Sequence, residues 1–472
     1  MSRASPETLL LAARRRPLDQ LESRLVRRHL AAPDASGRAV LDALRYVISL
    51  ARLTSLRGRE GRTLAVGSAM ALHSAWVKEE VEKRLVGLHR LSDLSGTIGD
   101  LVQRTREVRG SLLANLPVDR QELEAQVCRR TLVVVSGGGG GAGFVYPGVY
   151  HRLERMGLTP DLMVGTSIGA LLSLFRARHR TYDQAVLMEG ARSLSWSGIF
   201  TVLESKNRYG LPATLKMDLQ GVLGPIFRHP EGRTLYLSEL EIPTYVVSTG
   251  ITVDALKHDM DYYEHFFDGE VQRGAQAGLR SVAKTMQVVR EFLSRPDALV
   301  EVVLGRDAGT ERFDALDAAG FSSAIPGALH YDVLRSDARM HRILDALYAE
   351  RGITRLGEGG MVANVASRVG WESAAAGRLG IRNSFVLSLD CFAPSLRSPL
   401  WIPLAEAVRR ANVVEHSRFA DLTLTLTRTL SPLNLVPSVR DSMTAMRWGR
   451  EALEPHVPFM KEMMRPIPRL GG

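Results

Sequence analysis

The sequence has few cysteines, few lysines and no long apolar run, and the first and last of these shortages each exclude a class of protein. Its 472 residues include two cysteines, Cys128 and Cys391. Two cysteines cannot form a disulfide framework or a cysteine-rich zinc site, which is compatible with a reducing compartment. The longest charge-free apolar stretch, Thr63 to Val77, has 15 residues and contains His73. A membrane-spanning helix needs about 20.

The N-terminal stretch "ETLLLAARRRP" lacks the order of charges and apolar residues that a secretory signal has. We therefore expect neither a signal peptide nor a transmembrane helix, and a cytoplasmic protein that contacts a membrane at most peripherally.

Positive charge is concentrated at the N-terminus. Residues 1–130 contain 23 Lys and Arg against 15 Asp and Glu, a net charge of +8 out of +10 for the whole chain. Only seven of the 61 basic residues are lysine, which reflects genomic base composition better than selection for phosphate binding. A basic segment can favour anionic lipid or nucleic acid, although a solvated basic face is the simpler interpretation.

Residues 1–127 have the apolar spacing of helices, whereas later residues have that of an α/β domain. One helical stripe comprises Val40, Leu41, Leu44, Val47, Ile48 and Ala51. From residue 131, short apolar runs alternate with helical stretches: "TLVVV", "LMVGTS", "TYVVSTGI", "ALVEVVL", "SFVLSLD" and "DLTLTLT". This alternation predicts an α/β fold with a mostly parallel sheet. We expect a helical region at 1–127, an α/β domain at 128–456 with a helical insertion near 264–296, and a tail at 457–472.

Five consecutive glycines in "TLVVVSGGGGGAGF", residues 131–144, follow the first of these strands. A glycine loop between a strand and a helix exposes backbone N–H groups and suits an anion. A nucleotide-binding P-loop is a poor interpretation because Gly-Lys-Ser/Thr is absent, and no acidic residue completes a dinucleotide fingerprint. The loop therefore needs another explanation.

The next strand supplies one. "LMVGTSIGALLSLF" contains Gly165-Thr166-Ser167-Ile168-Gly169, a G-x-S-x-G sequence at a strand-to-helix turn. Such a turn presents the serine Oγ as a nucleophile.

Together these residues resemble the patatin-like phospholipases. "SGGGGGAGFVYPGVYHRLERMGLTPDLMVGTSIGAL" is similar to the family's glycine-rich loop followed by G-x-S-x-G. In order, "EIPTYVVSTGIT", "SSAIPGAL", "GEGGMVANV", "FADLTLTLT" and "DSMTAMRWGREALE" extend the similarity over roughly residues 130–456. The resemblance implies a three-layer α/β/α domain that hydrolyses lipid or phospholipid acyl esters.

It also implies roles for particular residues. Ser167 would be the nucleophile and Glu358 the general base, while the N–H groups of Gly138, Gly139 and Gly140 would stabilise the oxyanion. The family's carboxylate acts without histidine, and neither a metal nor an organic cofactor is expected.

Two departures from the family pattern lie at the expected reacting centre. Ala142 stands where the family usually has Arg or Lys, and Glu358 stands where it has Asp. Glu is one methylene longer, and a misplacement of about 1 Å can cost about 10²-fold in rate. Gly357 and Gly359 give the loop backbone the freedom to absorb that difference.

Several alternatives remain open. The departures leave open a catalytically weak scaffold that binds lipid or a protein partner. We do not expect the basic helices to bind nucleic acid. A Ser-His-acid triad would need His416 or His456, neither of which is well placed. A helical face within 272–295 fits packing on the domain better than a cover for an acyl pocket or contact with lipid.

Overall fold

The computed structural model describes residues 5–202, 208–252, 298–392 and 414–471. They form two compact units. One comprises residues 133–370 and 387–453, and the other comprises residues up to 132, 371–386 and those from 454 onward. The predicted helical insertion near 264–296, including the face within 272–295, lies outside the described residues.

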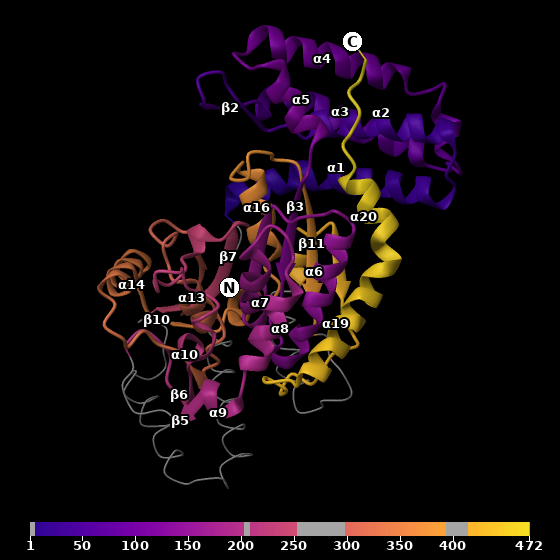
Figure 1. Cartoon of the computed structure of the whole chain (residues 1–472). Helices are drawn as coiled ribbons and strands as arrows, with labels where there is room; N and C mark the ends of the chain where they lie inside the picture. Colours follow the sequence, from indigo (N-terminus) through magenta and orange to yellow (C-terminus); the bar gives the residue numbers. More distant parts are fainter. Residues whose placement is uncertain (1–4, 203–207, 253–297, 393–413, 472) are drawn as a thin grey trace. The chain divides into compact units, whose positions relative to one another are not determined.

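Figure 1 shows the central sheet of the first unit. The sheet has seven strands. Their order is β10-β7-β4-β3-β11-β12, with β8 also paired to β7. The strands are β3 (Thr131–Ser136), β4 (Leu162–Thr166), β7 (Thr244–Thr252), β8 (Leu299–Leu304), β10 (Ile353–Gly357), β11 (Ser384–Asp390) and β12 (Leu422–Thr425). The pairs β3–β4, β4–β7 and β11–β12 are parallel, whereas β8 and β10 run antiparallel to β7. The predicted mostly parallel sheet is therefore confirmed.

Strand composition explains where the sheet is buried. Every residue of β3, "TLVVVS", is buried, as expected for a β-branched central strand covered on both faces. A second, three-stranded sheet has the order β5-β6-β9 and comprises β5 (Phe200–Val202), β6 (Ala213–Met217) and β9 (Gly327–His330).

Helices cover both faces of the central sheet. Side chains of successive strand residues point to opposite faces. A Cβ at Gly370 of α16 (Ser367–Ala375) would touch Val133, Val135 and Val164, which share one face. A Cβ at Gly165, on the other face, would touch Ala170 of α7 (Ile168–Ala177). The sheet thus lies between helical layers, which is the predicted three-layer arrangement.

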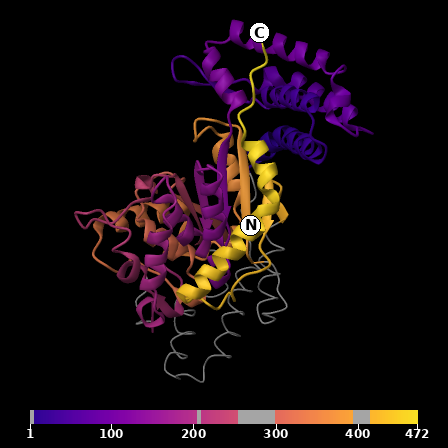
Figure 2. The same ribbon diagram turned by 45° about the vertical axis from the view of Figure 1, so that its right-hand side comes forward.

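The α7 layer also contains α6 (Tyr146–Arg155) and α19 (Val439–Leu453), which pack together (Figures 1 and 2). The other helices of this unit are η2 (Gly140–Val145), α8 (Gln184–Ser193), α9 (Trp196–Ile199), α10 (Leu219–Leu223), η3 (Leu237–Glu239), α13 (Ala315–Ser322), α14 (Ala338–Arg351), α15 (Gly360–Ala363) and α18 (Val414–Ser417).

The second unit is mainly helical. It contains α1 (Pro6–Ala31), α2 (Ala35–Ala51), α3 (Gly67–Leu85), η1 (Leu91–Leu94), α4 (Gly99–Asn115), α5 (Arg120–Cys128), η9 (Glu454–His456) and α20 (Val457–Met464), with a hairpin of β1 (Ser55–Arg57) and β2 (Thr63–Ala65). The predicted stripe on α2 is fully buried, from Val40 to Ala51. Asp34 caps α2 by accepting from the N–H of Gly37, so the chain turns between α1 and α2.

The core of the second unit includes Tyr46, Leu50, Met70, Leu123 and Val127. α20, at the start of the segment expected to be a tail, packs against α1. The sequence-based boundaries at 127 and 456 stay a prediction.

No described helix has both the length and the apolar character needed to cross a membrane.

Candidate active site

The turn after β4 holds Ser167 in a backbone conformation that non-glycine residues seldom adopt. β4 ends at Thr166 and α7 begins at Ile168. The φ of Ser167 is 55°, and within the described chain it is the only positive φ of a non-glycine residue. Such a conformation costs on the order of 1–3 kcal/mol. It places the serine at the N-terminal end of α7, where the helix dipole favours negative charge.

The glycines on either side of Ser167 allow the turn to close. A Cβ at Gly165 would lie 2.4 Å from the Cα of Ala170, and one at Gly169 would lie 2.2 Å from the carbonyl oxygen of Ser136. Both obstacles are backbone atoms that cannot move aside. The G-x-S-x-G spacing is therefore required by the close approach of β3, β4 and α7.

Ser322, to which the sequence analysis assigned no role, holds the same turn. The backbone N–H of Ser167 donates to Ser322 Oγ at 2.8 Å, and the Ser322 hydroxyl donates to the carbonyl of Val247 at 2.5 Å. Ser322 thereby ties the turn to β7. The motif "SSAIPGAL" contains this serine, but its partner lies 155 residues away in sequence.

The structure brings Glu358 to Ser167. Ser167 Oγ donates to Glu358 Oε2 at 3.1 Å, and Glu358 Oε1 accepts the N–H of Gly360 at 3.2 Å. The backbone of Glu358 is also fixed, because its N–H donates to the carbonyl of Ala324 at 2.9 Å. Its carbonyl accepts the hydroxyl of Thr249 at 2.7 Å. The longer side chain of glutamate thus reaches the serine from an anchored loop.

The glycines beside Glu358 serve close packing and not backbone freedom. Neither Gly357 nor Gly359 has a positive φ. A Cβ at Gly359 would lie 2.1 Å from the carbonyl oxygen of Val247, and one at Gly357 would lie 2.7 Å from a methyl of Leu211. Glycine is needed here because the loop lies directly on β7.

Burial raises the pKa of Glu358 to about 7, and the hydrogen bonds from Gly360 and Ser167 lower it only in part. The residue keeps some solvent access, but protein atoms surround its carboxyl group. Removing a carboxylate from water disfavours its charged form. A base is most effective when its pKa is near the working pH, so this carboxylate is better suited to accept a proton than an ordinary one.

The glycine loop lies beside both side chains. A Cβ at Gly138 would lie 3.1 Å from Ser167 Cβ and 3.6 Å from Glu358 Oε1. The φ angles of Gly139 and Gly140, 156° and 54°, are positive, which glycine adopts readily.

The three N–H groups expected to bind an oxyanion are not equivalent. That of Gly138 donates to the backbone carbonyl of Asn364 at 3.2 Å. Those of Gly139 and Gly140 have no hydrogen-bond partner within the described chain. Within the described chain, the N–H groups of Gly139 and Gly140 are therefore without a protein partner, whereas that of Gly138, the glycine nearest Ser167, is occupied.

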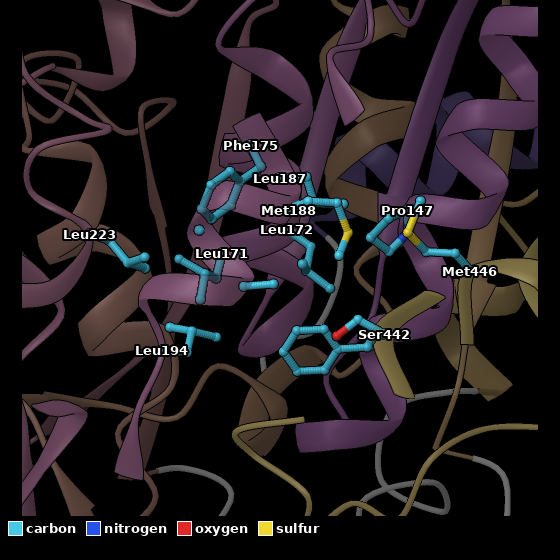
Figure 3. A pocket seen from close by; sticks show the side chains of 13 residues that line it. Pro147, Leu171, Leu172, Phe175, Leu187, Met188, Leu194, Leu223, Ser442 and Met446 are labelled. Carbon is cyan, nitrogen blue, oxygen red and sulfur yellow. The ribbon is translucent and has the colours of Figure 1, made fainter. Parts of the chain in front are cut away.

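An apolar cavity of about 30 Å³ lies next to α7, the helix that follows Ser167 (Figure 3). Leu171, Leu172 and Phe175 of α7 line it, together with Phe144, which follows the glycine loop. The remaining lining residues are Pro147, Leu187, Met188, Gly190, Ala191, Leu194, Leu223, Ser442 and Met446. Such a surface favours hydrocarbon over polar ligands.

Of the two histidines considered for a triad, His416 contacts a backbone N–H group. His416 Nδ1 accepts the backbone N–H of Arg368, and burial lowers the pKa of its imidazole to about 3. His456 belongs to η9. Among the described residues, no group of three or more His, Cys, Asp or Glu side chains is arranged to hold a metal ion.

A strained serine turn, a glycine loop and a mostly parallel α/β sheet are the features of a hydrolase-like α/β domain. The model of the patatin-like phospholipase family matches residues 133–368, half of the chain. The chain therefore belongs to the patatin-like phospholipase family, whose domain is that of lipid acyl hydrolases. None of the curated proteins matches it.

Proposed function

We propose that this protein hydrolyses acyl esters of lipids or phospholipids through Ser167 and Glu358. The hydrogen bond of 3.1 Å from Ser167 Oγ to Glu358 Oε2 carries this proposal. Its direction is that of the proton transfer that activates a serine, since the hydroxyl donates and the carboxylate accepts. The pKa of about 7 for Glu358 supports the role of a base at neutral pH.

In the first half-reaction, Ser167 Oγ attacks the ester carbonyl as Glu358 takes the hydroxyl proton. The carbonyl electron pair moves to oxygen, where the N–H groups of Gly139 and Gly140 stabilise the charge. When this intermediate collapses, the C–O bond to the alcohol breaks. Glu358 returns the proton to the departing oxygen, leaving an acyl ester on Ser167.

In the second half-reaction, Glu358 takes a proton from water, which attacks the acyl carbonyl. The bond to Ser167 Oγ then breaks and the serine regains its proton. The reaction releases a fatty acid and restores the free enzyme. It needs no electron donor and no metal or organic cofactor.

The apolar cavity beside α7, in which Ser442 is the one polar lining side chain, supports an apolar substrate by its chemistry, while its volume of about 30 Å³ holds one or two water-sized groups and not a whole acyl chain. The basic helical region supports peripheral contact with an anionic membrane in the cytoplasm. We also propose the division into a helical region at 1–127, a catalytic domain at 128–456 and a C-terminal segment at 457–472.

The replacement of Ser167 by alanine tests the reaction. Ser167→Ala should abolish both ester hydrolysis and labelling by a fluorophosphonate, because the attacking atom is lost. We expect its thermal midpoint to stay close to that of the wild type, since the turn accepts a small side chain. Labelling would be read by in-gel fluorescence, and hydrolysis with a panel of esters of increasing acyl length.

The outcomes separate two functions. Activity that persists in Ser167→Ala would show that another residue is the nucleophile. A wild-type protein that neither reacts with the fluorophosphonate nor cleaves any ester would favour a binding scaffold. The departures at Ala142 and Glu358 make that scaffold the principal alternative.

A further inference from the structure

Asn364 links the base to the glycine loop. It directly follows α15, the short helix that begins two residues after Glu358. Its backbone carbonyl accepts the N–H of Gly138, which ties the loop to this helix. The residue is 4% exposed.

The side chain of Asn364 lies in the same small volume as the reacting groups. Its Oδ1 would be 2.7 Å from a Cβ at Gly138 and 3.2 Å from one at Gly360. Glu358 Oε1 would lie 3.6 Å and 3.1 Å from those two positions. Since the Gly138 position is also 3.1 Å from Ser167 Cβ, the amide adjoins both members of the dyad.

No hydrogen bond joins the side-chain amide of Asn364 to another residue that the structure describes. A polar group without a protein partner can exchange hydrogen bonds with water for hydrogen bonds with a substrate. An amide kept in that state beside a nucleophile and a base is available to the substrate. Its oxygen and nitrogen exchange places by rotation about the terminal torsion, so either can face the reacting carbonyl.

The glycine loop leaves a donor position to fill, because Gly138 gives its N–H to Asn364. We propose, on the basis of the proposed function, that the side-chain Nδ2–H of Asn364 donates to the substrate carbonyl oxygen as it becomes an oxyanion. The donors are then the N–H groups of Gly139 and Gly140 and the amide of Asn364. No bond to Asn364 forms or breaks.

Loss of one oxyanion donor can lower kcat by about 10²–10³-fold. Asn364→Ala should lower kcat by at least tenfold with KM within about threefold of the wild type, because the contact strengthens in the transition state. Affinity for a trifluoromethyl ketone, which forms an oxyanion on Ser167, should fall in parallel. Both are measured on the full chain with a short-chain ester, and kcat is expressed per fluorophosphonate-reactive site.

Asn364→Asp keeps the shape of the side chain and replaces the donor with a charge. It should lower kcat, and it should move the acidic limb of the pH profile to higher pH because a second carboxylate raises the pKa of Glu358. This shift reports how close position 364 lies to Glu358, so the assignment of a donor role rests on kcat and on the ketone affinity of Asn364→Ala. Asn115→Ala, at the exposed end of α4, is the matched control and should change nothing.

A kcat within twofold of the wild type in Asn364→Ala would overturn the proposal. So would a loss confined to the number of reactive sites, with normal kcat for each. Ser167→Ala, measured in parallel, distinguishes a failure of this inference from a failure of the proposed function. If Ser167→Ala is inactive and Asn364→Ala is fully active, this inference alone fails. If Ser167→Ala is active, the proposed function fails as well.

Discussion

At the scale of single residues, the environment of Glu358 decides its chemistry. An exposed glutamate has a pKa near 4.3 and is a weak base at neutral pH. Burial raises the pKa of Glu358 to about 7, while the anchored backbone keeps the carboxylate 3.1 Å from Ser167 Oγ. The same burial makes the ionised form costly to the folded protein. Activity and stability should therefore respond to pH in opposite directions.

The first prediction from the raised pKa of Glu358 concerns how the rate of hydrolysis depends on pH. Glu358 must be ionised to accept the serine proton, so kcat/KM for a soluble short-chain ester should rise about tenfold per pH unit below 7. It should level off above that value. Glu358→Gln should lose nearly as much activity as Ser167→Ala, since the two act as one unit. An unchanged rate in Glu358→Gln would mean that another group is the base.

Shortening the same side chain tests the geometry. Glu358→Asp should lower the rate of hydrolysis. The loop is anchored and cannot move closer, so the shorter carboxylate would no longer reach Ser167 Oγ. A rate increase in Glu358→Asp, compared at the pH optimum of each variant, would instead indicate a decayed relative with a badly placed base.

The same raised pKa predicts how the stability of the folded protein depends on pH. The folded-state pKa of Glu358, about 7, lies above the value of about 4.3 that an exposed glutamate has, so the contribution of this residue to stability is greatest below about pH 4.3 and is lost as pH rises through 7. Glu358→Gln removes this cost and should be more stable than the wild type at pH 8, by at most about 3 kcal/mol. At pH 4.5 the difference should nearly vanish. Urea unfolding at the two pH values measures it, and an equal difference at both would refute the assigned shift.

At the scale of elements, glycines determine how closely the site's segments approach each other. The loop carrying Glu358 rests on β7 because Gly359 has no side chain, and the turn carrying Ser167 rests on β3 because Gly169 has none. A methyl group added at either glycine would overlap a backbone carbonyl oxygen and force the backbone to move. Backbone shifts in a packed interior lower the free energy of unfolding.

Gly359→Ala should therefore destabilise the protein by about 1–3 kcal/mol and reduce activity further, because the carboxylate moves away from Ser167. Gly110→Ala is the control. Gly110 lies within α4, and an added Cβ would meet nothing within 4 Å. That substitution should stabilise by about 0.5–1 kcal/mol through helix propensity. Thermal unfolding compares the two, and a neutral Gly359→Ala would contradict the packing argument.

At the scale of the whole molecule, the positive charge of the N-terminal region is only partly available at the surface. Arg45 and Arg52 are buried and pair with Glu22, while Arg109 pairs with Glu124. An arginine that is buried and paired with a carboxylate is not available to attract an anionic ligand at the surface. A surface that binds anionic lipid must therefore consist of the exposed basic residues, most of which are arginines.

Arg57, Arg62 and Arg120 are exposed. Replacing all three with glutamate should weaken binding to vesicles containing phosphatidylserine, at roughly 1 kcal/mol for each well-placed charge. Turnover of a soluble short-chain ester should stay unchanged. Vesicle co-sedimentation measures binding, with neutral phosphatidylcholine vesicles as the control. Equal binding by the wild type and the triple variant would refute the membrane role of this region.

The sequence by itself determined the features that depend on neighbouring residues. The runs from "TLVVV" to "DLTLTLT" predicted the strands of a mostly parallel sheet, because buried strands are continuous apolar segments. G-x-S-x-G indicated a turn with Ser167 at its apex, because its glycines and the adjoining apolar runs all lie within a few residues. The family resemblance rested on the order of such local motifs.

Tertiary structure decided what depends on residues far apart in sequence. Glu358 meets Ser167 across 191 residues, and its pKa follows from burial that no local pattern records. Ser322 fixes the serine turn, and Asn364 takes the N–H that Gly138 would otherwise offer. Sequence patterns report which backbone a segment prefers, whereas distances, desolvation and shared hydrogen bonds arise only when those segments pack together.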